Sequence, residues 1–330
     1  MKRVLITGAG GQIGSQLTRR LLQDGNSVVA LDNFSTSNPL QLHELASYAN
    51  LSIANQNVRD EIEPLGKFEE IYHLAAPASP VHYLSDPLGT MITIQEGTQN
   101  VLNLAMSTGA KILIASTSEI YGDPSVHPQT ESYRGNVDPT GLRACYKESK
   151  RYSETLAAEY QRSFGVETRI ARIFNTYGPG ANRNDGRVIP EFLLAAIKGE
   201  PLHLHNGGIQ TRSYCYVDDM LTGLIGLMES KLSGIPVNLG NPEEITVKEL
   251  ASLILQVTGS ESPIIQSQAR ADDPSRRRPD ISLAHSQLGW YPVTNLVDGL
   301  AKTAQWMKTA EVFKSNLPHW SERQLPNAVM

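Results

Sequence analysis

Two side chains four residues apart, Tyr146 and Lys150, have the types needed for acid–base chemistry at a hydroxyl group. Residues 141–164 are predicted to form a helix, and positions four apart lie on one face of a helix. A tyrosine has a pKa of about 10, so its phenol is a weak base at neutral pH, but a neighbouring ammonium group favours the phenolate. Taken alone, such a pair is more often found on a helix surface than in a catalytic site. It becomes informative if a redox cofactor binds nearby.

A glycine-rich turn supplies that context. The run 7–14 has glycines at positions 8, 11 and 14 (Gly8, Gly11 and Gly14) and lies between a predicted strand and a predicted helix. Glycines there allow a tight turn and a close approach of the backbone to a pyrophosphate, which the helix N-terminus attracts. Asp32 ends the next predicted strand, where a carboxylate binds ribose hydroxyls and repels a 2′-phosphate. The pattern predicts NAD rather than NADP, and the oxidised nicotinamide would further favour the Tyr146 phenolate.

A third group of polar residues, 116–122, directly follows a predicted strand at 111–115. Side chains at the carboxyl end of a strand line the crevice of an open α/β sheet. Thr117 is placed to hydrogen-bond a sugar hydroxyl, and Glu119 adds a carboxylate. The alternative is that these residues cap a helix or form a turn.

The elements that must position these residues alternate between strands and helices. We expect strands at residues 4–6, 27–31, 51–54, 71–74, 111–115 and 168–173, and helices at 12–22, 92–106 and 141–164. Continuous apolar strands separated by helices are typical of a parallel sheet covered on both faces. We therefore predict an α/β fold, a Rossmann-type doubly wound parallel sheet at 1–175, with a smaller C-terminal α+β substrate lobe at 176–330 that is interleaved with it.

Composition excludes several other classes of protein. The chain has 330 residues with 40% hydrophobic residues and a formal charge of −5, so nucleic acid is not an expected partner. No run approaches 18 apolar residues, and we expect a cytoplasmic protein with no membrane segment. Cys145 and Cys215 form no disulfide framework, and His203 with His205 lacks a third ligand, so no metal site is predicted.

Several longer motifs are specific to one family. They are Ser116–Asp123, His127-Pro128-Gln129, Cys145-Tyr146 with Lys150-Arg151, Arg172–Pro179, Asp185–Val188, Gln210-Thr211-Arg212, Asn238–Pro242, Asp272-Asp273-Pro274, Arg277 and Pro279–Ile281. Together they resemble the UDP-glucuronate decarboxylase (UDP-xylose synthase) family of extended short-chain dehydrogenases/reductases. The resemblance runs from residue 4 to about residue 292, nearly the whole chain.

The resemblance implies a bound NAD that is reduced and reoxidised within one turnover. Tyr146 would take the proton from the sugar O4 while C4 gives up hydride. The resulting 4-keto acid would lose CO₂, be protonated at C5 and be reduced again to UDP-xylose. The implied catalytic residues are Thr117, Glu119, Tyr146, Lys150 and Arg277.

The resemblance also implies binding residues and a homodimer formed through helices near 92–106 and 141–164. The expected contacts of NAD are Gly8, Gly11, Gln12, Ile13, Gly14, Asp32, Asn33, Ser35, Thr36, Ser37, Asn57, Val58, Leu74, Asn100, Tyr146, Lys150, Thr176 and Arg187. Those of the UDP-sugar are Tyr83, Ser118, Asn175, Gln210, Arg212 and Arg277, with Tyr83 in a loop that covers the sugar.

Some positions depart from the family pattern, and other activities remain open. Asn57 stands where an adenine-binding Asp is usual, Ala76 replaces a Ser, Ile92 a substrate-contacting Lys, Gly180 an Arg and Glu191 an Asn. These changes leave another acidic nucleotide sugar possible. A UDP-glucuronate 4-epimerase is the main alternative. A 4,6-dehydratase normally has an Asp where Ser118 stands, and a non-catalytic NAD-binding scaffold would not need Thr117, Tyr146 and Lys150.

Overall fold

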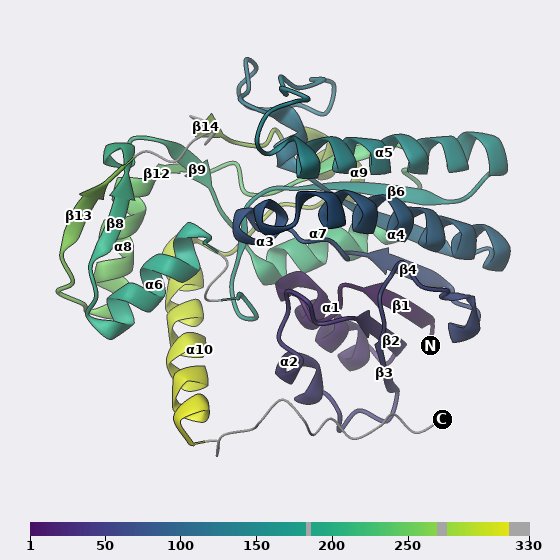
Figure 1. Cartoon of the computed structure of the whole chain (residues 1–330), viewed down its shortest axis with the longest axis horizontal. Helices are drawn as coiled ribbons and strands as arrows, with labels where there is room; N and C mark the ends of the chain where they lie inside the picture. The colour runs from purple at the N-terminus through teal and green to yellow at the C-terminus, as the bar shows by residue number, and fades with distance from the viewer. Residues whose placement is uncertain (183–185, 269–275, 317–330) are drawn as a thin grey trace.

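A seven-stranded parallel sheet forms the centre of the molecule in the computed structural model, which describes residues 1–182, 186–268 and 276–316 (Figure 1). Its order is β11-β6-β5-β4-β1-β2-β3, so the chain builds one half outward from β1 and then returns to build the other. The strands are β1 (Arg3–Thr7), β2 (Ser27–Asp32), β3 (Leu51–Asn55), β4 (Glu70–His73), β5 (Lys111–Thr117), β6 (Thr168–Ile173) and β11 (Pro236–Leu239). The predicted doubly wound parallel sheet is confirmed.

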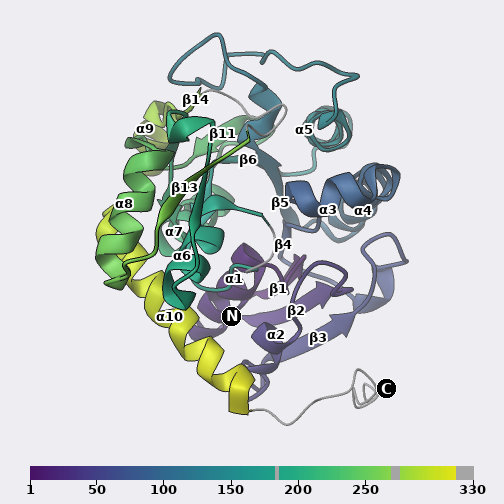
Figure 2. The ribbon, with the colours of Figure 1, turned by 60° about the vertical axis from the view of Figure 1, so that its left-hand side comes forward.

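Helices cover both faces of this sheet, as Figure 2 shows. On one side lie α3 (Pro80–Ser85), α4 (Pro87–Thr108) and α5 (Ala144–Phe164); on the other lie α1 (Gln12–Gln23) and α7 (Val217–Glu229). Apolar side chains on successive strand residues therefore all find a covering helix. Val4, Leu5 and Ile6 of β1, for example, are completely buried. The same double coverage explains why the strands read as continuous apolar runs.

A smaller lobe stands beside the carboxyl ends of the strands. It contains three short sheets: β8 (Leu202–His205) with β13 (Ile264–Ser267); β9 (Thr211–Ser213) between β12 (Glu244–Thr246) and β14 (Arg276–Arg277); and β7 (Thr176–Tyr177) with β10 (Cys215–Tyr216). Its helices include α6 (Val188–Lys198), α8 (Val247–Thr258) and α10 (Leu296–Asn316), whereas α9 (Ser282–Leu288) packs against β11 and α7 of the main part. A short α2 (Leu40–His43) follows β2. After residue 176 the chain returns to the main sheet through α7 and β11, so sequence order and spatial units interleave.

Element boundaries differ from the predictions where capping decides them. The helix predicted from Ile92 begins at Pro87, because the Asp86 carboxylate accepts a hydrogen bond from the Gly89 amide and proline suits the first helical position. The helix expected from Gly141 begins at Ala144. Strand β5 runs two residues beyond its predicted end, so Thr117 is its last residue.

Within the described ranges, no helix is long and apolar enough to cross a membrane. Both cysteines are buried and form no disulfide. The motif 272–274 and the residues after 316 lie outside the described part of the chain.

Candidate active site

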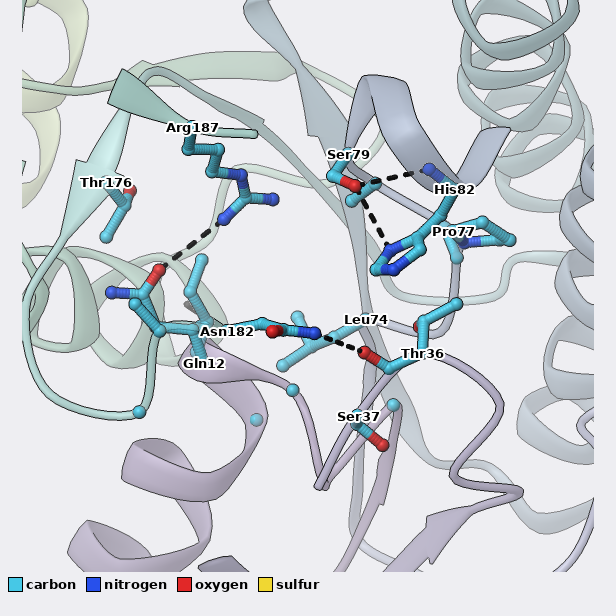
Figure 3. Close-up of a pocket in the computed structure, with 18 of the residues that line it drawn as sticks. Gln12, Thr36, Ser37, Leu74, Pro77, Ser79, His82, Thr176, Asn182 and Arg187 are labelled. Carbon is cyan, nitrogen blue, oxygen red and sulfur yellow. Dashed lines mark hydrogen bonds between the residues drawn. The ribbon is translucent and has the colours of Figure 1, made fainter. Parts of the chain in front are cut away.

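A large cavity of about 800 Å³ runs along the carboxyl ends of the parallel strands and under the smaller lobe. The glycine turn and the end of β2 form one end, and β9 and β14 of the smaller lobe contribute to the other. Figure 3 shows the part where the turn after β1 faces residues from the lobe. Ligands of open α/β sheets bind at this edge because the strand ends expose loops and helix N-termini there.

The glycine turn has a shape that other residues would not permit. A Cβ on Gly8, whose φ is +71°, would lie 2.7 Å from the Ala75 nitrogen, and one on Gly14 would lie 2.2 Å from the Gly8 oxygen. The Asp32 carboxylate closes the turn by accepting hydrogen bonds from the amides of Gly10 and Phe34, both at 2.8 Å. The open, glycine-lined cradle with a carboxylate at its edge fits a dinucleotide such as NAD.

Tyr146 and Lys150 lie together on α5, as their spacing predicted, and both line the cavity. They are only 5% and 3% exposed. The Lys150 Nζ lies 5.9 Å from the centre of the Tyr146 ring and donates a hydrogen bond to the Ala115 carbonyl oxygen at 2.7 Å. A side-chain hydrogen bond joins Tyr146 to Thr117, the last residue of β5. A phenol, a hydroxyl and an ammonium therefore meet at one strand end.

Burial has a larger effect on this pair than the sequence argument allowed. Desolvation raises the pKa of Tyr146 above its usual value, and the charge of Glu119 raises it further. Arg187, the hydrogen bond from Thr117 and Arg277 act in the opposite direction. Burial also lowers the pKa of Lys150 to about 8. Desolvation therefore opposes the phenolate, and the positive charge of both Lys150 and the oxidised nicotinamide is what is expected to favour it.

A carboxylate and a guanidinium face each other at the substrate end of the cavity. Glu119 lies on the 3₁₀ helix η2 (Ser118–Tyr121), and its Oε1 is 3.8 Å from Nη1 of Arg277. The other oxygen, Oε2, is buried without a hydrogen-bond partner among the described residues. Arg277 lies on β14 directly opposite Arg212 on β9, so two cations stand side by side. This arrangement suits a substrate that carries several negative charges.

Four hydrogen bonds join the smaller lobe to the glycine turn and its surroundings. Figure 3 shows two of them: Arg187 Nη1 donates to Gln12 Oε1 at 3.5 Å, and Asn182 Nδ2 donates to the Thr36 carbonyl at 3.3 Å. The side-chain amides of Gln12 and Gln41 donate to the carbonyls of Gly178 (3.0 Å) and Gly180 (2.8 Å). The cofactor end of the cavity is thus bridged by direct contacts between the two parts of the molecule.

Comparison with known proteins agrees with this geometry. Residues 4–240 match the model of the NAD dependent epimerase/dehydratase family. UDP-glucuronic acid decarboxylase 1 of Danio rerio is 47% identical over 98% of this chain and 75% of its own length. UDP-glucuronic acid decarboxylase 6 of Arabidopsis thaliana is 47% identical over 90% of this chain and 86% of its own length. The chain belongs to the UDP-glucuronate decarboxylase family.

The fold is also similar to solved structures of other nucleotide-sugar enzymes. A UDP-glucose 4-epimerase from Thermotoga maritima, solved with UDP-glucose, has a TM-score of 0.87 and 26% identity, and the alignment covers 94% of this chain and 99% of that one. A dTDP-glucose 4,6-dehydratase from Streptomyces venezuelae, solved with NAD, has a TM-score of 0.86 and 27% identity over 94% of this chain and 98% of that one. The Rossmann-type fold and NAD, predicted from the glycine turn and Asp32, are thereby confirmed.

Most residues expected at the site of this decarboxylase-family chain line the one cavity. On the cofactor side these are Gly8, Gly11, Gln12, Ile13, Gly14, Asp32, Asn33, Ser35, Thr36, Ser37, Asn57, Val58, Leu74, Tyr146, Lys150, Thr176 and Arg187. On the substrate side they are Thr117, Ser118, Glu119, Asn175, Gln210, Arg212 and Arg277. Ala76, Gly180 and Glu191, which depart from the family pattern, line it too.

Three expected positions lie elsewhere. Asn100 lies on α4 outside the cavity, where its amide donates hydrogen bonds to the carbonyls of Val58, Arg59 and Asp60 and holds that turn. Tyr83 belongs to helix α3 rather than a covering loop; it is fully buried and stacks on Tyr146 with ring centres 5.0 Å apart. Ile92 is 38% exposed on α4 and does not line the cavity.

Several lining residues carried no recognisable signal in the sequence. Arg143, at the start of α5, Gln41 on α2 and His82 on α3 all line the cavity. Each reaches it through the packing of its helix and belongs to no motif that would single it out. Among the described residues, no cluster of three or more His, Cys, Asp or Glu could hold a metal ion, and His203 and His205 pair instead with Ser267 and the Gln268 carbonyl.

Proposed function

We propose that this chain converts UDP-glucuronate into UDP-xylose and CO₂ through a 4-keto intermediate, with the residue roles given below. A bound NAD would supply the hydride acceptor for oxidation at the sugar C4 and the hydride donor for the later reduction. The observation that carries the proposal is the meeting in one cavity of the Tyr146–Thr117–Lys150 group and the Glu119–Arg277 pair. The first group serves oxidation of a hydroxyl, and the second serves a carboxylate next to it.

The NAD site lies along the glycine turn. The turn would hold the pyrophosphate, and Asp32 the adenosine ribose. Asn57 and Val58 line the cavity further along and would contact the adenine. Lys150, whose Nζ lies beside the Tyr146 ring, would bind the ribose next to the reacting ring. Thr176 and Arg187 would complete the enclosure from the side of the smaller lobe, and Gln12 from the side of the glycine turn.

Tyr146 takes the proton from O4 as C4 is oxidised, and returns it when C4 is reduced. Thr117 orients both the phenol and the O4 hydroxyl. Since burial raises the pKa of Tyr146, the phenolate depends on positive charge brought close to it. Lys150 provides part of that charge. Tyr83, which stacks on the Tyr146 ring, keeps the phenol in its orientation rather than covering the sugar.

Loss of CO₂ follows from the chemistry of the 4-keto acid. The bond between C5 and C6 breaks, its electron pair passes into the C4 carbonyl, and the enolate takes a proton at C5. Arg277, beside Arg212, would hold the carboxylate and the enolate oxygen in a cavity where charge is poorly screened. Glu119 would position the sugar and manage the proton. Ser118, Asn175 and Gln210 would bind the remaining polar groups of the UDP-sugar.

The fate of the carboxyl carbon tests this proposal. The protein is incubated with UDP-glucuronate in D₂O, and the products are examined by mass spectrometry and NMR. We expect CO₂, UDP-xylose with deuterium at C5, and no net accumulation of NADH. UDP-galacturonate with six sugar carbons retained would identify a 4-epimerase. Turnover of neither uronate, with NAD still bound, would indicate another nucleotide sugar.

We also propose a homodimer in the cytoplasm. Leu88, Met91 and Ile92 of α4 and Tyr152 of α5 are apolar or aromatic residues between 38% and 72% exposed on the outer helices. Residues 88, 91 and 92 share one face of α4, so a second copy of the pair α4 and α5 would cover them. Light scattering after gel filtration should give twice the monomer mass, and Met91→Asp should halve it.

A further inference from the structure

We propose that Gln129 is a positioning residue that holds Arg277 against Glu119 for the loss of CO₂. The inference rests on the proposed function. Gln129 lies in the loop between η2 and α5, is fully buried and does not line the cavity. It therefore acts on the substrate through the segments it holds in place, chiefly the one that carries Arg277.

Gln129 makes three hydrogen bonds to the segment just after Arg277. Its backbone amide donates a hydrogen bond to the Arg278 carbonyl at 2.9 Å. Its side-chain Oε1 accepts one from the Arg278 amide at 2.8 Å, and its carbonyl accepts one from the Asp280 amide at 2.8 Å. Strand β14 consists of Arg276 and Arg277 alone, so its own ladder offers few hydrogen bonds. The three bonds from Gln129 therefore help to hold Arg277 in place.

The same glutamine is linked to the element that carries Glu119. Asn238 donates through Nδ2 to the carbonyls of both Gln129 (2.9 Å) and Asp280 (3.1 Å). Its Oδ1 accepts a hydrogen bond from the hydroxyl of Tyr121 at 2.7 Å. Tyr121 is the last residue of η2, on which Glu119 lies. One buried network therefore sets the position of the carboxylate and of the guanidinium relative to each other.

The side-chain amide of Gln129 acts as both a hydrogen-bond acceptor and a hydrogen-bond donor. While Oε1 accepts from Arg278, Nε2 donates to the Val126 carbonyl at 2.9 Å and holds the side chain in that orientation. Methionine has a similar length but offers neither function, whereas glutamate keeps the acceptor. Since a displacement of about 1 Å from a distant change can reduce a rate about 10²-fold, loss of this clamp should be measurable.

The test uses the full-length protein with its bound NAD and UDP-glucuronate as substrate. For Gln129→Met we expect kcat for CO₂ release to fall about 10- to 100-fold, more than KM rises. Oxidation at C4 depends on Tyr146 and Thr117, so NADH absorbance should build up during turnover. Gln129→Glu should lie between this variant and the parent. The double variant Gln129→Met/Arg277→Ala should be no slower than Arg277→Ala, because Gln129 acts through Arg277.

Met228→Ala provides the control for a loss of stability alone. Met228 is fully buried on α7 and does not line the cavity. Its neighbour Glu229 approaches Lys2 at the amino end of β1, the opposite end of the sheet from the site. Met228→Ala should lower the melting temperature and leave kcat unchanged. Full kcat in Gln129→Met, losses that add in the double variant, or equal losses of kcat in Gln129→Met and Met228→Ala would each overturn the inference. Failure of the parent protein to release CO₂ would instead overturn the proposed function.

Discussion

The two walls of the cavity differ in whether their buried ionisable side chains are paired with an opposite charge. On the cofactor wall, burial is the largest influence on the pKa of the lining residues Lys150 and Tyr146, and also on that of His73, which lies buried on β4 outside the cavity. It lowers the pKa of His73 to about 3 and that of Lys150 to about 8, and raises that of Tyr146. On the substrate wall, formed by η2 and β14, Glu119 faces Arg277, and outside the cavity Glu154 of α5 binds Arg172 of β6 at 2.8 and 3.0 Å.

The difference separates reactivity from positioning. A group that must exchange protons needs a pKa that its surroundings can move, and desolvation without a close ion pair leaves it responsive to the next charge that arrives. A buried cation that supports the substrate wall from behind has to stay charged and in place. Burial alone would lower the pKa of Arg172, but the hydrogen bond and charge of Glu154 offset this and leave it raised. Ser116, just before Thr117, also donates a hydrogen bond to Glu154, so the paired wall supports the reactive one.

The sharpest test of the reactive wall is Tyr146→Phe. The phenol would be lost with little change in volume, so we expect turnover to fall about 10²- to 10⁴-fold, the usual contribution of a general acid–base group. Bound NAD and the melting temperature should stay near the parent values. Tyr291→Phe, at a tyrosine that is 52% exposed and outside the cavity, is the matched control. Steady-state kinetics measure the effect. Near-full activity of Tyr146→Phe would show that another residue is the general base.

On the paired wall, Glu154→Leu should destabilise the fold. The Arg172 guanidinium would be left buried without its carboxylate, which typically costs about 3–5 kcal/mol of the free energy of unfolding. Glu154→Leu/Arg172→Met should recover a large part of that loss, because neither charge then remains. Urea denaturation measures both. A double variant as unstable as the single one would show that packing, and not the ion pair, supports this wall.

Lys150→Met should show the effect of burying this lysine on how stability depends on pH. The pKa of about 8 in the folded protein lies below the ordinary lysine pKa of 10.5, so between these pH values the unfolded chain binds more protons. Stability of the parent apoprotein should therefore rise with pH in this window, by about 3 kcal/mol relative to Lys150→Met. Denaturation curves from pH 7 to 10.5 provide the measurement, and Lys308→Met, an exposed change, should keep the parent slope. Parallel curves for parent and Lys150→Met would contradict the assignment.

The smallest effect is expected where the smaller lobe meets the cofactor wall. Gln41→Ala removes the hydrogen bond to the Gly180 carbonyl and the one that Ser15 donates to Gln41. A hydrogen bond contributes about 0.5–1.5 kcal/mol, so bound NAD should dissociate about 2- to 10-fold faster. Stopped-flow release of the cofactor measures this, with the exposed Gln305→Ala as control. Unchanged release would show that this contact does not retain the cofactor.

Element boundaries show how far local sequence reaches. Strand β6 occupies the predicted residues 168–173, because an apolar run bounded by turns has one way to join the sheet. Helix α4 begins five residues before its predicted start, since an Asp86 cap and Pro87 decide the start and the apolar pattern does not. Tyr83 was expected in a loop over the sugar and is instead buried under Tyr146, a contact between helices that no spacing predicts.

The sequence by itself determined the cofactor wall. Gly8, Gly14, Asp32, Thr117 and the Tyr146–Lys150 spacing act at strand ends or on one helix face, where a few adjacent residues set the geometry. Only the tertiary structure decided the substrate wall and the protonation behaviour. Arg277 meets Glu119 across 158 positions of the chain through β14 and the Gln129 network, and the pKa values follow from burial. Desolvation and long-range hydrogen bonds depend on which elements pack together, and the residues adjacent in the sequence do not specify that packing.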